Sequence, residues 1–370
     1  MTIYPKLISD ALSGVRYPGN GKSLVENNMI EDDIRIDGNK VSFSLIFDKS
    51  TDPFIRSVVR AAEAAIASEI SPDVEVSINV KTRQAPPAKP AVLPGVKNIV
   101  GVSSGKGGVG KSTVAANLAV ALAAKGYKVG LLDADIFGPS MPKMFGVEDE
   151  ELYMINKEGR NWIEPIEKYG VKMLSIGFMV DKEKPVLWRG GMASNALRQL
   201  ISDAWWGDLD YFLIDMPPGT SDIHLTLVQT LPITGVVVVS TPQEVALADA
   251  RKGIAMFTGE AVNVPILGLV ENMAWFTPAQ HPDEKYYIFG EGGAVKLAQE
   301  QGVSLLAQIP LVMDIRTHAD DGAPVALELE KDPEHASPEA KAFESLADNV
   351  VAAVTERNET LPPTTKVETH

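Results

Sequence analysis

The residues best suited to chemistry form a glycine-rich segment, GVSSGKGGVGKST, at positions 101–113. An apolar run typical of a strand precedes this segment, and an Ala- and Leu-rich run typical of a helix begins within it at Thr113. Closely spaced glycines let backbone N–H groups turn inward, and together with a helix N-terminus such groups bind phosphate. The segment therefore predicts a site for the phosphates of a nucleotide.

Two side chains of this loop are expected to bind different groups, one the phosphates and the other a metal ion. Lys111 is expected to reach the β- and γ-phosphates of ATP, and the Ser112 hydroxyl is expected to ligate Mg²⁺. A full G-x-x-x-x-G-K-[ST] match between a strand and a helix favours this interpretation over a glycine-rich turn without ligand. The predicted nucleotide-binding residues of the loop are Gly105, Gly107, Gly108, Val109, Gly110, Lys111, Ser112 and Thr113.

Carboxylates follow two other apolar runs. Asp133 and Asp135 end the run at 129–132, and Asp215 ends the run at 211–214. Parallel strands present their carboxyl ends at one edge of the sheet, so these side chains should face the same crevice as the loop. Asp215 would hold Mg²⁺ through water, and Gly219 would offer its N–H to the γ-phosphate. The alternative for Asp133 and Asp135 is helix capping.

These motifs need a scaffold that brings strand ends together. From Val96 onward, helical segments separate short continuous apolar runs, at 99–102, 129–132, 211–214, 236–239 and 266–270. Runs without polar alternation suit strands buried on both faces. The pattern predicts an α/β fold, a doubly wound and mostly parallel sheet, preceded by a small α+β domain. The expected divisions are a small domain at 1–82, a linker at 83–95 with four prolines, an ATPase domain at 96–358 and a polar tail at 359–370.

Within the small domain, residues 34–47 read as a hairpin with one buried face, because apolar residues alternate with serines after Asp37-Gly38-Asn39. An Ala-rich helix at 54–68 and a strand at 74–80 follow.

The formal charge of −15 argues against binding to nucleic acid. We expect a cytoplasmic protein without membrane contact, because there is no signal-peptide pattern and no apolar run of about 20 residues.

Five segments together resemble one family, the Mrp (ApbC-like) iron-sulfur cluster carrier ATPases. The resemblance covers nearly the whole chain, and DxPPGTxD is its most specific motif. It implies ATP hydrolysis with Mg²⁺, and a role in assembling iron-sulfur clusters or transferring them to apoproteins. The segments are GKGGVGKST, LLDADIFGPS, LWRGGMASNALRQL, IDMPPGTSDIHLTLVQ and IPLVMDIRTHADDGAPV.

Lys106 makes the loop similar to the deviant Walker A pattern of Mrp, MinD, ParA and nitrogenase-iron-protein-like ATPases. The resemblance implies that Lys106 crosses a homodimer interface to the partner's nucleotide, and that Asp135 positions or activates the attacking water. It also implies that Asp133 lies near the Mg²⁺ shell and that Asn272 and Pro310 surround adenine. The residues alone also allow a solvated Lys106 and a turn-forming Asn272.

Members of the family usually carry a Cys-x-x-Cys pair after the segment that matches ENMAWF, but this chain has no cysteine. Iron-sulfur clusters depend on thiolate donors, and His281 with Asp283 and Glu284 forms a harder donor set suited at most to a single metal ion. In the small domain, Asp52 stands where relatives often have a cysteine. The composition therefore argues against carriage of a cluster by this chain alone.

Two functions follow from different classes. One is an ATPase in iron-sulfur cluster assembly or transfer, with the sulfur ligands left to a partner. The other is a MinD/ParA-type positioning or partition switch, which needs a basic surface or amphipathic basic helix. The C-terminal helix at 338–357 has an apolar stripe but an acidic polar face, which favours the first function.

The histidines, at 224, 281, 318, 335 and 370, show no metal-ligand spacing.

Overall fold

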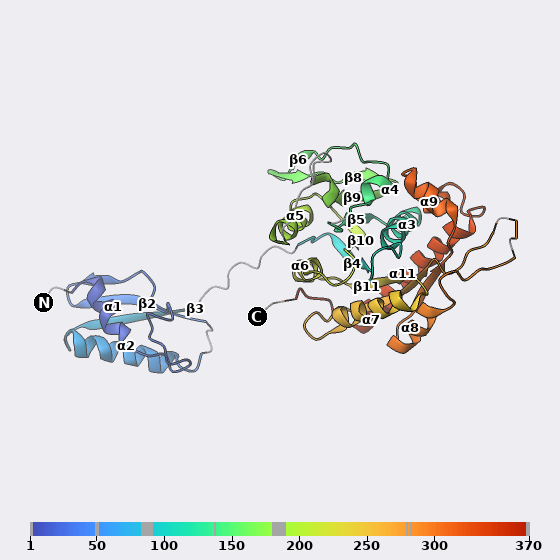
Figure 1. Ribbon diagram of the computed structural model, residues 1–370. Coiled ribbons are helices and arrows are strands. Elements are labelled where there is room, and N and C mark those ends of the chain that lie inside the picture. Colours follow the sequence, from blue (N-terminus) through green and yellow to red (C-terminus); the bar gives the residue numbers. More distant parts are fainter. Residues whose placement is uncertain are drawn as a thin grey trace. The chain divides into compact units, whose positions relative to one another are not determined.

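The computed structural model describes residues 3–48, 52–82, 92–136, 138–179, 190–278, 280–281 and 283–367. Contacts divide the chain into two compact units, Met1–Pro90 and Ala91–His370 (Figure 1). This division falls inside the predicted linker, of which residues 83–91 lie outside the described residues. The beginning of the LWRGG segment lies outside them as well. Each unit has its own core and is described by itself.

The small unit is a three-stranded sheet with two helices. Strands β1 (Arg35–Asp37) and β2 (Lys40–Phe47) form the predicted hairpin, and Gly38 adopts a φ of +59° in its turn. Strand β3 (Glu75–Thr82) pairs with β2 in parallel. Helices α1 (Pro5–Ser13) and α2 (Ile55–Glu69) contribute Ile8, Leu12, Val58, Ala62 and Ile66 to the core on the alternating apolar face of β2.

Asp33 lies just before β1 and is hydrogen-bonded to β2. Its carboxylate accepts the N–H of Ser44 at 2.9 Å and the Ser44 hydroxyl at 2.6 Å, and Lys81 Nζ lies 3.3 Å away. The bond from the Ser44 hydroxyl is the main reason why the pKa of Asp33 is lowered. A lowered pKa in the folded state stabilises the fold above the unfolded pKa, and this stabilisation is lost as the pH falls through the folded pKa.

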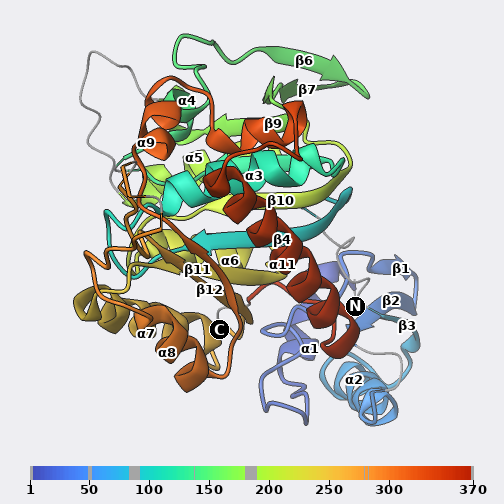
Figure 2. The ribbon, with the colours of Figure 1, turned by 90° about the vertical axis from the view of Figure 1, so that its right-hand side faces the viewer.

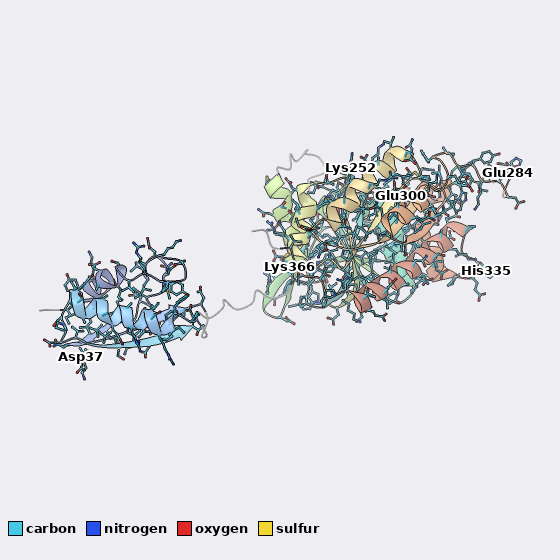
Figure 3. All side chains as sticks on the ribbon, turned by 90° about the horizontal axis from the view of Figure 1, so that it is seen from below. Asp37, Lys252, Glu284, Glu300, His335 and Lys366 are labelled. Carbon is cyan, nitrogen blue, oxygen red and sulfur yellow. The ribbon has the colours of Figure 1, made fainter. Side chains whose placement is uncertain are left out.

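Replacing Asp33 with Asn should therefore lower the free energy of unfolding of the small unit by about 1 kcal/mol at pH 7. Calorimetry of the full chain at several pH values measures this, and the difference from wild type should vanish in acid. Asp37→Asn is the matched control, because Asp37 is exposed at the hairpin turn (Figure 3). Equal losses for the two variants at pH 7 would contradict the assignment.

The large unit is built on an eight-stranded sheet that is parallel except for the antiparallel edge strand β8. The predicted runs all lie within its strands. From one edge to the other the strands are β13 (Leu305–Ile309), β12 (Ile266–Asn272), β11 (Gly235–Ser240), β4 (Val96–Ser103), β10 (Leu209–Asp215), β5 (Val129–Asp133), β9 (Val171–Ser175) and β8 (Ile166–Lys168).

Helices cover both faces of this sheet (Figures 1 and 2). In β4, Val100 and Val102 belong to the core under α3 and α11, whereas Ile99 belongs to the core on the opposite face. The helices on the first face are α3 (Lys111–Ala124) and α11 (Pro338–Thr360). Those on the second are α5 (Gly190–Ser202), α6 (Asp222–Thr230), α7 (Glu244–Thr258) and α8 (Gly293–Gln301). The predicted doubly wound α/β fold is confirmed.

Short elements connect this framework. They are α4 (Met141–Met144), the hairpin β6 (Met154–Lys157) and β7 (Arg160–Ile163), the 3-10 helix at Ile176–Met179, α9 (Met313–Asp320), the 3-10 helix at Val325–Leu327, and α10 (Glu328–Lys331). No helix in the described part of the chain is both long enough and apolar enough to span a bilayer.

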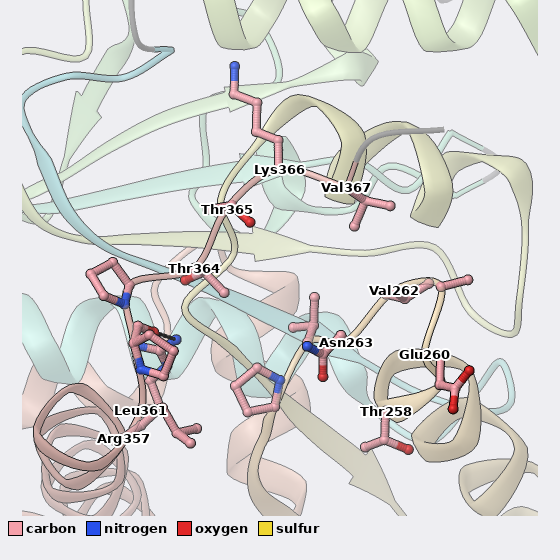
Figure 4. A pocket seen from close by; sticks show the side chains of 15 residues that line it. Thr258, Glu260, Val262, Asn263, Arg357, Leu361, Thr364, Thr365, Lys366 and Val367 are labelled. Carbon is pink, nitrogen blue, oxygen red and sulfur yellow. Dashed lines mark hydrogen bonds between the residues drawn. The ribbon is translucent and has the colours of Figure 1, made fainter. Parts of the chain in front are cut away.

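The C-terminal segment, predicted as a polar tail at 359–370, contacts the large unit through its described residues. Helix α11 continues to Thr360, and the Val367 N–H donates to the Val228 carbonyl at 3.1 Å. Together with the loop after α7, the segment lines a cavity of about 480 Å³ (Figure 4). This cavity lies by Pro265, just before the amino end of β12, whereas the glycine-rich loop follows the carboxyl end of β4. It is therefore separate from the predicted nucleotide site.

Candidate nucleotide site

The glycine-rich loop connects β4 to α3, as predicted, and two of its glycines have left-handed backbones. Gly108 has a φ of +82° and Gly110, the N-cap of α3, has a φ of +83°. A Cβ on Gly110 would lie only 2.1 Å from Nδ2 of Asn272. Conformation and close packing therefore both require glycine at position 110.

Gly105 is held against the backbone of helix α7. A Cβ at this position would lie 2.1 Å from the carbonyl carbon of Asp249 and 2.4 Å from the nitrogen of Ala250. These atoms belong to the helix backbone and cannot move aside as a side chain can. By contrast, a Cβ on Gly107 would meet nothing closer than Pro218 Cγ at 4.0 Å.

Gly105→Ala should consequently lower the free energy of unfolding of the large unit by about 1–3 kcal/mol, through overpacking. Gly107→Ala introduces the same methyl group two residues away and should leave the unfolding midpoint nearly unchanged. Urea titration of both variants without nucleotide separates this packing effect from any effect on binding. A Gly105→Ala protein as stable as Gly107→Ala would show that the loop does not rest on α7 in solution.

Lys111 is the central cation of the site. Its side chain is only 6% exposed, and Nζ lies 2.5 Å from Asp215 Oδ1, 3.2 Å from Ser112 Oγ and 3.6 Å from Asp135 Oδ2. The structure thus brings together four residues that come from the loop and from two separate strand ends. An ammonium group held among carboxylates in this way can also bind phosphate oxygens.

Asp215 reaches this point because of the strand register. It pairs with Val102 of β4 and with Asp133 of β5, so three parallel strands end side by side. The side chain is fully buried, and its Oδ2 has no hydrogen-bond partner among the described residues. Burial raises the pKa of Asp215, while the neighbouring Lys111 acts in the opposite direction. An unpartnered carboxylate oxygen beside a hydroxyl is a donor set that fits Mg²⁺.

Asp133 has its hydrogen bonds satisfied within the protein. It accepts the Ser175 hydroxyl at 2.8 Å and the N–H groups of Met141 and Asp135, each at 3.2 Å. Burial, followed by the charge of Asp215, raises the pKa of Asp133 to about 7. These contacts fix the backbone around Asp135. They give Asp133 a supporting position, and its predicted place near the metal stays a prediction.

A cavity of about 230 Å³ lies over this cluster. The predicted residues Gly107, Gly108, Gly110, Lys111, Ser112, Thr113 and Asp135 line it. The Val109 side chain is buried and can offer only its backbone, and Lys106 is exposed. A cavity at the N-terminus of α3 with a buried lysine at its base is suited to bind the phosphates of a nucleotide.

Three residues predicted to contact the nucleotide are engaged with other parts of the protein. The Gly219 N–H donates to the Ser104 carbonyl at 2.8 Å, so contact with a γ-phosphate requires that this bond open. Asn272 donates its amide to the Val109 carbonyl at 2.8 Å and thereby supports the loop from below. Pro310 is buried between Ile309 and Leu311, whose backbones bond to the segment after Asn272. Adenine contacts of Asn272 and Pro310 stay predictions.

Sequence reasoning missed three buried residues that support the site. Ser175 pairs with Asp133 in the β5–β9 register, and His224 caps α6 after the Asp215 turn. Glu271 accepts the Ala294 N–H and the Gln308 amide, both at 2.7 Å. Their partners are distant in the chain or depend on helix geometry. None of the three gave a local signal, since the capping box at 221–224 has histidine where the usual pattern has Glu or Gln.

The comparisons with known proteins agree with this geometry. The family described as NUBPL iron-transfer P-loop NTPase matches residues 95–351, which is most of the chain. The chain belongs to this family. A second family, described as iron-sulfur cluster assembly protein, matches residues 6–80 in the small unit.

Individual relatives of this P-loop NTPase are similar over most of their length. This chain is 44% identical to an iron-sulfur cluster carrier protein of Synechocystis, and the match covers 93% of this chain and 96% of that protein. It is 47% identical to an iron-sulfur cluster carrier protein of Escherichia coli, covering 78% and 75%. A nucleotide-binding protein from Archaeoglobus fulgidus, solved with ADP, is 37% identical with a TM-score of 0.56, covering 68% of this chain and 93% of that one.

In the segment where the family resemblance implies a Cys-x-x-Cys pair, Phe276 and Tyr286 exchange backbone hydrogen bonds at 2.9 and 2.8 Å. His281 lies 3.3 Å from Glu284 at the surface, and the described residues contain no group of three or more His, Cys, Asp or Glu side chains able to hold a metal. Without cysteine anywhere in the sequence, the donors do not fit an iron-sulfur cluster.

Proposed function

We propose that the chain is a Mg²⁺-dependent ATPase that acts in the assembly of iron-sulfur clusters or their transfer to apoproteins, without holding the cluster through its own side chains. The observation that carries the ATPase part is the Lys111–Asp215–Asp135 cluster beneath the cavity, with a buried Asp215 oxygen that has no hydrogen-bond partner among the described residues. Family membership supports the iron-sulfur part. We place this action in the cytoplasm.

The chain's own residues take the following roles. Lys111 binds the β- and γ-phosphates, and Asp135 at the cavity edge orients the attacking water and accepts its proton. Ser112 and Asp215 would hold Mg²⁺, which when bound would neutralise charge on the phosphates. Asp133 fixes the Asp135 backbone through its own hydrogen bond to that N–H. The Lys111 ammonium group that bonds to Asp215 has three N–H donors, so it can bond to phosphate as well.

We further propose a homodimer in which Lys106 acts on the partner's nucleotide. The exposure of Lys106 next to the cavity-lining Gly107 supports a role across an interface. Mixing Lys106→Ala with Asp135→Ala tests this directly. In a mixed dimer, the Lys106→Ala subunit keeps Asp135 and receives Lys106 from its partner, so phosphate release should reappear. Two variants that stay inactive when mixed would contradict action in trans.

The iron-sulfur part is tested by maturation of an apo iron-sulfur enzyme from a cluster-loaded scaffold protein that supplies thiolates. Adding the chain with ATP should raise the rate of enzyme activation, and adding the Lys111→Ala variant should not. Equal activation by both proteins would contradict a nucleotide-driven role in transfer.

The alternative function, a MinD/ParA-type positioning or partition switch, needs a basic surface or an amphipathic basic helix and is not favoured. In α11 the predicted apolar stripe, Phe343, Leu346, Val350 and Val354, is at most 2% exposed. This stripe packs in the core with α3 and is not presented to a membrane.

A further inference from the structure

His224 is a buried imidazole at the third position of α6, directly after the turn that begins at Asp215. The N–H of Ser221 donates to its Nδ1 at 3.1 Å, and the Ser221 hydroxyl lies 3.2 Å from the same nitrogen. This is a capping box in which histidine takes the place of the usual Glu or Gln. The ring is 1% exposed and stacks edge-on to Phe257 of α7, with centroids 5.8 Å apart.

The capping bond fixes the position of the ring proton. A backbone N–H can only donate, so Nδ1 of His224 accepts and the proton of the neutral ring lies on Nε2. Burial lowers the pKa of His224 to about 4, and the charge of Lys111 acts in the same direction. The ring is therefore neutral near pH 7. Its Nε2 is buried and has no hydrogen-bond partner among the described residues, which is costly for a donor.

The turn that begins at Asp215 carries a backbone acceptor that acts on this ring. The Pro217 carbonyl shifts the pKa of His224 upward, against the effect of burial, but it forms no hydrogen bond with Nε2. The turn rests on the phosphate loop, because Gly219 donates to Ser104 and Pro218 lines the nucleotide cavity. A shift of the turn that frees the Gly219 N–H would also move the Pro217 carbonyl relative to His224.

We propose that His224 is a positioning residue for the γ-phosphate. When the Gly219 N–H leaves the Ser104 carbonyl, the Nε2–H of His224 donates a hydrogen bond to the Pro217 carbonyl. This inference rests on the proposed ATPase function. The bond would satisfy the buried donor only in the state in which the turn engages a γ-phosphate. Because ADP lacks that group, His224 favours ATP over ADP and supports turnover.

Binding of AMPPNP and ADP with Mg²⁺, measured by displacement of a fluorescent nucleotide, tests this. His224→Leu should weaken AMPPNP binding about tenfold relative to ADP. His224→Gln should keep the ratio within about threefold, because its side chain can accept from Ser221 and donate to Pro217. His335→Gln, at an exposed position labelled in Figure 3, is the control and should match wild type.

The outcomes separate this inference from the proposed function. If the ratio of AMPPNP affinity to ADP affinity is unchanged in His224→Leu, the inference is overturned. It is also overturned if both His224 variants lose the same affinity for both nucleotides, because that would indicate a purely structural role. A wild-type protein that binds neither nucleotide overturns the proposed function and the inference together.

A spectroscopic test does not need the leucine variant to fold. In ¹⁵N-histidine NMR of the wild-type protein, one ring should keep the neutral Nε2–H form from pH 5 to pH 8, identified by its loss in His224→Gln. Its Nε2–H proton should move downfield with AMPPNP and Mg²⁺ but not with ADP and Mg²⁺. Identical shifts with both nucleotides, or no shift with AMPPNP, would overturn the inference.

Discussion

Replacing Lys111 with Ala is expected to lower the affinity for ATP by at least about 100-fold, because several charge-assisted bonds to phosphate are lost at once. The side chain is buried at the base of the cavity, and among the described residues no other lysine or arginine lines that cavity to replace it. Equilibrium binding of a fluorescent ATP analogue measures the effect. Lys106→Ala, an exposed lysine of the same loop, should bind within a few-fold of wild type.

The same substitution also leaves buried carboxylates without their cation, so loss of binding must be separated from loss of fold. Removing one partner of a buried ion pair costs about 3–5 kcal/mol unless the other group becomes neutral. Lys111→Ala should therefore melt earlier than wild type, and adding Asp215→Asn should restore part of the melting temperature but no ATP binding. ATP affinity near the wild-type value in a folded Lys111→Ala protein would contradict the site.

Replacing Asp135 with Ala should keep nucleotide binding and lower kcat by about 10²–10⁴-fold, the range expected when a general base is removed. Its carboxylate is 9% exposed at the cavity edge and lies 3.6 Å from Lys111 Nζ, so it is the carboxylate of the cluster that water can reach. Steady-state phosphate release and ADP binding, measured on the same preparation, give turnover and affinity separately.

Asp210→Asn is a suitable control for this experiment. Asp210 lies near the amino end of β10, opposite the end that carries Asp215, and pairs with Lys97 at the surface at 2.8 Å. Its kcat should equal the wild-type value. Normal kcat in Asp135→Ala would show that another group positions the water.

The phosphate loop, the strand ends and the sheet could be predicted because their signals are local. The apolar runs around 99–102, 129–132 and 211–214 became β4, β5 and β10, and Asp215 follows from the end of its run. The hairpin at β1 and β2 followed from alternation and a Gly-Asn turn. Such patterns depend on neighbours within a few residues, which the sequence displays directly.

Partners distant in the chain could not be predicted. That Asn272 supports Val109, or that Ser175 bonds to Asp133, depends on strand order and register. Weak edge strands such as β8 lacked a strong apolar run, and the parallel pairing of β2 with β3 is set by the helix between them. The burial of His224 likewise appears only once α6 and α7 are packed together.

The chain has no cysteine, whereas the family resemblance implies a Cys-x-x-Cys pair. In the small unit, Asp52 accepts the Tyr17 hydroxyl at 2.5 Å and the Phe54 N–H at 2.8 Å, so its carboxylate is engaged in the fold. Neither unit therefore offers a thiolate, and the sulfur ligands of any cluster must come from another molecule.

Anaerobic reconstitution of the purified full-length chain with ferrous iron and sulfide, without added thiol, tests this claim most directly. After gel filtration, absorption spectroscopy and quantitation of iron and sulfide report any cluster that stays bound. We predict no stoichiometric cluster, while the same preparation binds ATP. A stable cluster in stoichiometric amount would contradict a carrier-family ATPase that leaves the cluster to its partners.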